Sequence, residues 1–116
     1  MTFDDVRAIA LVWPGVEDGT SYGTPGLKVK GKFLTRLRED GDSLVVASVP
    51  RDERDMLIEA DPAVFYITQH YRDYPAVLVR LSAADPNTVR SLLFRHWRTI
   101  APKRLVRAWD ADQPGR

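Results

Sequence analysis

The segment Tyr71–Tyr74 combines two tyrosines with an arginine and an aspartate, and Pro75 separates it from residues 76–81, which are apolar except for Arg80. Planar rings and a guanidinium group can stack on nucleic-acid bases or lie in a groove of a duplex. The alternative is a rigid turn whose tyrosines pack over a sheet edge, with Pro75 fixing the entry to a strand. A turn with no other role more often uses Asn-Gly or Asp-Gly, so this segment is a candidate binding element.

Basic and acidic residues are separated along the chain. More than half of the 17 Lys and Arg residues lie in two acid-free stretches, between Asp18 and Glu39 and between Asp85 and Asp110. They are Lys28, Lys30, Lys32, Arg36 and Arg38 in the first, and Arg90, Arg95, Arg98, Lys103, Arg104 and Arg107 in the second. Such cations can neutralise backbone phosphates and release counterions. The alternatives are two solvated faces that never meet, and edge-strand lysines that deter aggregation.

Other candidate residues favour structural roles. His70 is either a ligand of a phosphate or base or a polar cap at a strand end, and His96 lies in the apolar stripe of a helix, which predicts a hydrogen-bonded core histidine. Their separation and the absence of cysteine predict no metal site. The loop around Tyr22 and Thr24 either lines a small-molecule pocket or permits a bulge. No phosphate-binding loop, nucleophile elbow or placed carboxylate pair is found, so we expect neither an enzyme nor a cofactor.

The totals are those of an ordinary globular domain. The chain has 116 residues, 44% of them hydrophobic and 28% charged, with a formal net charge of +1 and no cysteine. This length is enough to bury one core without disulfides. The acidic start and the lack of a long apolar run predict neither a secretory signal nor a membrane span. We therefore expect a cytoplasmic protein.

Hydrophobic spacing predicts three helices and a short basic addition. The first covers about residues 3–12, the second begins at Pro50 and ends at Asp61-Pro62, and the third follows the N-cap Asp85. A basic helical turn or two over 103–109 comes last. The buried positions expected are Val6, Ile9, Ala10 and Trp13 in the first helix, Glu53, Met56, Leu57 and Ala60 in the second, and Val89, Leu92, Leu93, His96, Trp97 and Ile100 in the third.

Alternation and turn residues predict five strands. The polar residues 17–19 are expected to form a connection, and a hairpin then turns at Lys30-Gly31-Lys32. Its apolar face is expected to carry Leu27, Val29, Phe33, Thr35 and Leu37, and its cationic face Lys28, Lys30, Lys32, Leu34, Arg36 and Arg38. A third strand covers 43–49. Residues 64–70 and 76–81 predict a second hairpin whose connection lies near Arg72-Asp73.

This order predicts an α+β fold in two layers, with an antiparallel sheet of about five strands and helices on one face. The elements follow as helix, three strands, helix, two strands, helix. Residues 1–109 are expected to form the single domain, and 110–116 a polar tail. The cationic side chains of the first hairpin must then point away from the helices.

Several blocks of the chain, taken together, resemble the MmcQ/YjbR family of small bacterial proteins. The blocks are Gly19–Pro25, Leu27–Leu34, Ala60–Pro62, His70–Val79, Trp97-Arg98 and Ala101–Arg104. The resemblance implies a fold similar to that of the frataxin homologue CyaY, and a DNA-binding role with a "double wing". It does not extend to iron chemistry, because the first helix offers only Asp4 and Asp5 as acids.

The residues and the resemblance lead to one functional hypothesis: a non-enzymatic DNA-binding protein that contacts mainly backbone phosphates. The expected contact residues are Lys28, Lys30, Lys32, Arg36, His70, Tyr71, Arg72, Tyr74, Lys103 and Arg104. No helix-turn-helix signal is present, so base-specific recognition is not predicted. We expect a monomer or weak dimer without membrane contact. The alternative hypothesis is a small-ligand or protein-interaction domain using the open sheet face and the loops of Tyr22 and Tyr74.

Overall fold

Six strands form one antiparallel sheet in the order β1-β2-β3-β4-β6-β5, in a computed structural model that describes residues 1–113. The strands are β1 (Val16–Ser21), β2 (Thr24–Val29), β3 (Lys32–Leu37), β4 (Ser43–Ala47), β5 (Phe65–Tyr66) and β6 (Ala76–Arg80). The helices are α1 (Phe3–Ala10), α2 (Arg51–Ala60), α3 (Pro86–Ile100) and α4 (Lys103–Asp112), with 3-10 turns η1 (Gln69–Tyr71) and η2 (Leu81–Ala83). The α+β class with helices on one face is as predicted.

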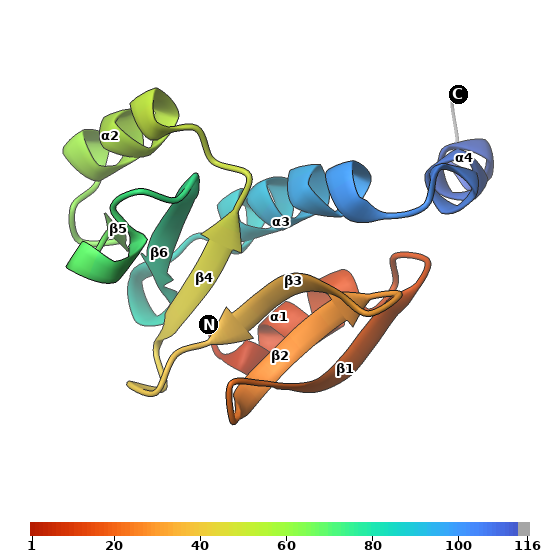
Figure 1. Cartoon of the computed structure of the whole chain (residues 1–116), viewed down its shortest axis with the longest axis horizontal. Helices are drawn as coiled ribbons and strands as arrows, with labels where there is room; N and C mark the ends of the chain where they lie inside the picture. The colour runs from red at the N-terminus through yellow and green to blue at the C-terminus, as the bar shows by residue number, and fades with distance from the viewer. Residues whose placement is uncertain (114–116) are drawn as a thin grey trace.

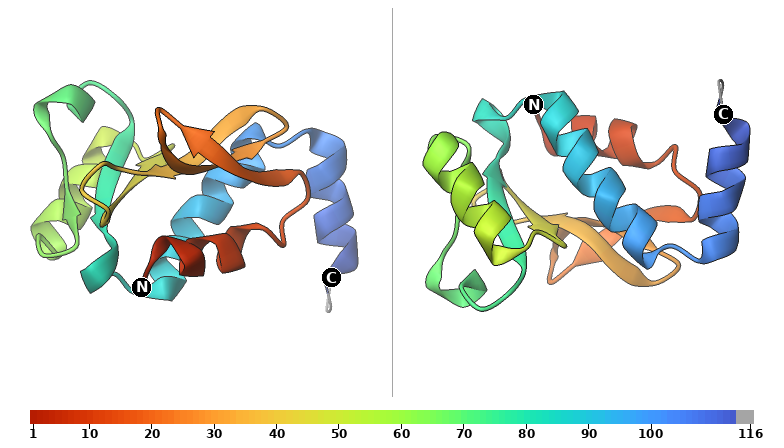
Figure 2. Two further views of the ribbon diagram at one scale, coloured as in Figure 1. Left: turned by 90° about the horizontal axis from the view of Figure 1, so that it is seen from below. Right: turned by 90° about the horizontal axis from the view of Figure 1, so that it is seen from above.

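Helices α1 and α3 lie behind the sheet in the view of Figure 1, and the two views of Figure 2 place them on the same side of it. We call the opposite side of the sheet the open face. The segment that contains η1 rises on this side, across from the turn between β1 and β2 (Figure 2). The helices therefore leave one face of the sheet available for a ligand.

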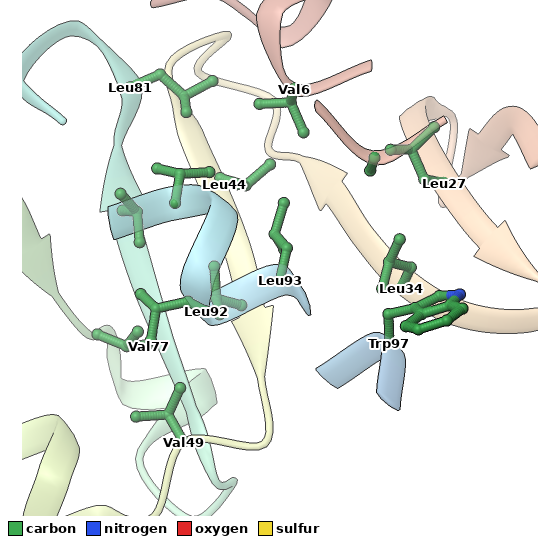
Figure 3. Packing of buried hydrophobic residues seen from close by; sticks show 14 of the residues in the cluster. Val6, Leu27, Leu34, Leu44, Val49, Val77, Leu81, Leu92, Leu93 and Trp97 are labelled. Atoms are coloured by element: carbon green, nitrogen blue, oxygen red, sulfur yellow. The ribbon is translucent and has the colours of Figure 1, made fainter. Parts of the chain in front are cut away.

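The core lies between the sheet and α3, where buried side chains of β2, β3, β4 and β6 meet Leu93 and Trp97 (Figure 3). The Asp85 side chain caps α3 by accepting a hydrogen bond from the Thr88 N–H, which satisfies one of the free donors of the first turn. Trp97 donates its indole N–H to the Pro14 carbonyl at 3.0 Å. Helix α3 thus holds both the sheet and the connection between α1 and β1.

Strand β1 is a correction, because residues 17–19 were predicted to be a polar connection. They pair along β2, from Val16 opposite Val29 to Ser21 opposite Thr24. Most of this edge strand is exposed, so its sequence lacks the alternation that marks a half-buried strand. The strand depends mainly on its backbone pairing with β2, which polar composition does not reveal.

The predicted second hairpin is confirmed in its antiparallel pairing, but its first strand is much shorter than predicted. Of residues 64–70, Phe65 and Tyr66 form the paired strand β5, opposite Val79 and Leu78 of β6. The chain then leaves the sheet, and the Tyr71 N–H bonds to the Thr68 carbonyl to form η1. Residues 67–75 are therefore a long connection with its own helical turn.

The faces of β3 also differ from the prediction. Phe33 lies opposite Lys28 and Thr35 opposite Leu27, with a register shift between these pairs that leaves Leu34 as an extra residue. This bulge brings Leu34 into the core and leaves Phe33 outside it. A bulge shifts the period of two by one residue, which alternation alone does not reveal.

The predicted buried side of helix α2 is only partly right: Leu57 packs against the core and Glu53 is half-buried, but the other two positions are exposed. Met56 is 67% exposed and Ala60 is exposed, whereas Arg54 is 5% exposed. Helix α1 ends at Ala10, two residues before the predicted end, and α4 continues through Asp112 into the predicted tail. The rest of that tail, from 114 on, lies outside the described residues.

Candidate nucleic-acid interface

A groove of about 930 Å³ lies on the open face. Phe33 of β3, Val45 and Ala47 of β4, and Ala76 of β6 contribute to its lining from the sheet. We call these four residues the floor. The remaining lining residues are Thr20, Ser21, Tyr22, Lys28, Gly31, Arg36, Glu39, His70, Tyr71, Tyr74 and Pro75. The groove thus has a mainly apolar floor and aromatic, basic and polar sides.

The first wall of the groove is the two-residue turn Tyr22-Gly23 between β1 and β2. Both residues have positive φ, 54° at Tyr22 and 79° at Gly23, as a type I′ hairpin turn requires. Asn is the usual first residue of such a turn, because a bulky side chain is strained in the left-handed region. Tyr22 is nevertheless 84% exposed, so burial does not explain its presence.

The second wall is the segment Gln69–Tyr74, which carries an aromatic cluster. The ring centres of His70 and Tyr71 are 4.8 Å apart, and those of His70 and Tyr74 are 5.9 Å apart. Tyr74 is 55% exposed. This wall therefore presents tyrosine to the groove from the side opposite Tyr22.

Two arginines of α2 hold the second wall. The buried guanidinium of Arg54 donates through Nη1 to the carbonyls of Arg72 and Tyr74 at 3.1 Å each, and to that of Tyr71 at 3.5 Å. Arg51, one turn earlier, reaches the Asp73 side chain at 3.4 Å. The connection between β5 and β6 is not paired in the sheet, so its backbone carbonyls need other donors. Arg54 of α2 is buried because it supplies them.

Arg36 joins the two walls. Its guanidinium carbon lies 5.2 Å from the centre of the Tyr22 ring, and its Nη2 donates to the Tyr71 hydroxyl at 3.3 Å. It also pairs with Glu39 at 3.3 Å and is only 8% exposed. Arg36 is thus committed to holding the groove together rather than being free to meet a phosphate.

The alternation of rings and guanidinium groups continues beyond the groove. Arg38 lies 5.8 Å from the Tyr71 ring centre and donates to the Tyr66 hydroxyl at 3.5 Å, and Arg80 lies 4.0 Å from the Tyr66 ring centre. The Tyr66 hydroxyl also bonds to Ser43. Cation–π pairs of this kind fix planar groups in place, so the open face is a preorganised surface.

Two carboxylates near this surface are held in their charged form. A hydrogen bond from its own backbone lowers the pKa of Glu39, and Arg36 adds a smaller effect in the same direction. The Ser43 hydroxyl, 2.6 Å away, lowers the pKa of Asp40, with help from the backbone N–H groups of residues 42 and 43. Both side chains therefore offset part of the positive charge of the arginines beside them.

Four exposed cations lie at or beside the groove. Lys28 lines it, Lys30 and Lys32 flank the lining residue Gly31, and Arg72 follows η1. All four are exposed, and within residues 1–113 none of them has an ion-pair partner. Their charge remains available to an anionic ligand.

The ten predicted contact residues are only partly brought together. Lys28, Arg36, His70, Tyr71 and Tyr74 line the groove, and Lys30, Lys32 and Arg72 lie beside lining residues. Lys103 and Arg104 do not line it, because they begin α4 at one end of the sheet (Figure 1). That end is still close to the first hairpin, since Leu105 and Lys30 both approach Gly15.

Three residues that line the groove, Tyr22, Phe33 and Glu39, are not among the predicted contact residues. For Tyr22 the signal is a Tyr-Gly pair in a two-residue turn, at a position where asparagine is preferred. Phe33 was hidden by the bulge. Glu39 carried no pattern of its own.

The prediction that His96 is a hydrogen-bonded core histidine is confirmed. His96 bonds through Nδ1 to the Ser48 hydroxyl at 2.7 Å and through Nε2 to the Phe33 carbonyl at 3.0 Å. Burial lowers the pKa of His96, and the bond to Phe33 opposes this in part. His96 thereby links Phe33, which lines the groove, to α3.

Within residues 1–113 no cluster of three or more His, Cys, Asp or Glu side chains is placed to hold a metal ion. None of the helices in this range has the length and apolar character needed to cross a bilayer.

Comparison with known proteins identifies the family. The YjbR family model matches residues 11–99. The chain is 36% identical over 95 residues to the uncharacterized protein Mb2600 of Mycobacterium bovis and to the uncharacterized proteins MT2646 and Rv2570 of Mycobacterium tuberculosis, covering 79% of this chain and 74% of each relative. No solved structure matches significantly, so the likeness to CyaY stays a prediction. The chain belongs to the YjbR family.

Proposed function

We propose that this protein binds nucleic acid on the open face of its sheet, without a catalytic step. The observation that carries the proposal is a set of four exposed cations at or beside the groove, none of which forms an ion pair within residues 1–113: Lys28, Lys30, Lys32 and Arg72. Phosphates attract such cations and release counterions when they bind them. The helices leave this face free (Figure 2).

Local acids set the size of the expected effect. Glu17 lies directly opposite Lys28 across β1 and β2, and Glu39 neutralises Arg36. A small number of phosphate contacts is therefore expected, with moderate affinity and a shallow salt dependence. Arg36 acts by positioning the walls, and Lys103 and Arg104 are not needed for the contact.

The test uses a fluorescently labelled 20-nucleotide DNA strand and its duplex, titrated with the protein at several salt concentrations. We expect binding of at least one form that weakens as salt increases. Lys28→Glu should weaken it several-fold and reduce the salt slope by roughly one unit. The matched control is Arg90→Glu, the same charge reversal on an exposed residue of α3. Equal affinity of both variants and the unchanged protein would contradict the proposal, as would no binding at low salt.

A second candidate function is supported by the groove itself. Its volume, about 930 Å³, is within the range of small-molecule sites, about 300–1,000 Å³. Its apolar floor and aromatic walls suit a planar molecule with an anionic group. Thermal unfolding with nucleoside monophosphates separates the two functions: a free mononucleotide that stabilises the protein as strongly as an oligonucleotide favours the small ligand.

A further inference from the structure

The geometry points to single-stranded nucleic acid as the ligand, with a base inserted between the Tyr22 wall and the Gln69–Tyr74 wall of the groove. This inference rests on the nucleic-acid-binding function proposed above and specifies its substrate class. It assigns the exposed tyrosines the task of stacking, and leaves the phosphates to Lys28 and the cations beside it.

The chemistry of the floor is the first reason. Phe33, Val45, Ala47 and Ala76 come from neighbouring strands and offer apolar side chains to whatever enters the groove. Phosphates and sugars, which a duplex presents on its outside, gain nothing from an apolar surface. The face of an unpaired base does, because stacking and burial of its ring remove apolar area from water.

The placement of Tyr22 is the second reason. The turn holds this residue at a φ of 54°, where most side chains are strained, and leaves it 84% exposed. Arg36 supports the ring at 5.2 Å. Strain kept at an exposed residue suggests a use for that residue. A supported and exposed ring is a stacking platform, and a base that is already stacked inside a duplex cannot reach it.

The opposite wall supplies the third reason. Tyr74 is 55% exposed and lines the same groove as Tyr22, and the carbonyl of Tyr74 is held by Arg54 at 3.1 Å. Aromatic residues on both sides of one groove can hold a planar ring from both sides. Lys28 lines the same groove, so a strand whose base is inserted would bring a phosphate toward a cation.

The test compares four DNA probes at one salt concentration: a single-stranded 12-mer of thymidines, a single-stranded 12-mer of mixed sequence, a duplex hairpin, and a 12-mer of abasic sites that keeps the phosphates. We expect the two base-containing single strands to bind at least about 10-fold more tightly than the hairpin and the abasic strand. This size corresponds to the stacking of roughly one base on an aromatic ring.

Three variants assign the effect to the ring of Tyr22. Tyr22→Ala should weaken binding of the base-containing single strands by about 5- to 100-fold and leave the abasic strand unchanged. Tyr22→Phe keeps the ring and should bind normally. Tyr22→Asn creates the preferred Asn-Gly turn, so it should lose the same affinity while the protein remains folded, which separates lost stacking from lost structure.

The outcomes also distinguish this inference from the function beneath it. Equal or tighter binding of the hairpin, or an equal effect of Tyr22→Ala on the abasic strand, would overturn single-strand recognition, yet the phosphate contact would stand if Lys28→Glu still weakened binding. No binding of any probe at low salt would overturn both.

Discussion

The two walls of the groove are built in opposite ways. The Tyr22 wall is a two-residue turn whose backbone conformation is set locally, by Gly23 and by pairing of the flanking strands. The Gln69–Tyr74 wall is a long connection held from outside by Arg54 and Arg51 of α2. Tyr22 of the first wall can therefore be substituted at little cost to the fold, whereas the second wall depends on the buried side chain of Arg54.

The largest expected effect is at Arg54. Arg54→Ala removes the donor of three backbone carbonyls and leaves a cavity at a buried position, which should lower the free energy of unfolding by about 3 kcal/mol. Urea unfolding measures it. Arg54→Lys keeps the charge but has fewer donors. Its free energy of unfolding should lie between those of Arg54→Ala and the unchanged protein. A loss below about 0.5 kcal/mol for Arg54→Ala would show that the second wall does not depend on α2.

Acid sensitivity of the floor comes next. Burial lowers the pKa of His96 in the folded state below the ordinary histidine value of 6.5. As the pH falls below about 6.5, the unfolded chain binds a proton that the folded protein does not, so stability decreases until the folded-state pKa is passed. His96 also bonds to the carbonyl of Phe33. Protonation of His96 therefore acts on a residue of the groove floor.

The measurement is urea unfolding of the unchanged protein and of His96→Gln at pH 7.5 and pH 5.5. The variant lacks the titrating group, so its stability should decrease less between these two values. Parallel changes in the two proteins would mean that His96 titrates equally in the folded and unfolded states.

The same contrast explains what the sequence could predict. The α3 cap at Asp85, its buried stripe and the β2–β3 turn at Lys30-Gly31 depend on neighbours within a few residues, and each was predicted correctly. Arg54 could not be placed, because an arginine on a helix is ordinarily exposed and its carbonyl partners lie 17 to 20 residues away in the chain. The tyrosines of the second wall were recognised by type, but the loop that positions them was not.

A smaller effect, of opposite sign, is expected at the first wall. Tyr22→Asn should raise the free energy of unfolding by about 0.5–1 kcal/mol, since asparagine tolerates the left-handed conformation that Tyr22 adopts at a φ of 54°. Thermal unfolding at constant protein concentration measures it. Tyr22→Val is the opposing control, because a β-branched residue fits this conformation worst. A destabilised Tyr22→Asn would show that the contact of Tyr22 with Arg36 outweighs the strain of the turn.

The smallest effect is expected at Arg51, which contacts the second wall as Arg54 does but from an exposed position. Its side chain is 61% exposed and that of Asp73 is 87% exposed, with 3.4 Å between the charged groups. Solvent screens such a pair, so Arg51→Ala should change the free energy of unfolding by less than about 0.5 kcal/mol. Arg51 and Arg54 are one helical turn apart and reach the same segment, so the difference between them reports the combined effect of burial and of the three carbonyl bonds of Arg54. Similar losses for both variants would instead attribute the anchoring to α2 as a whole.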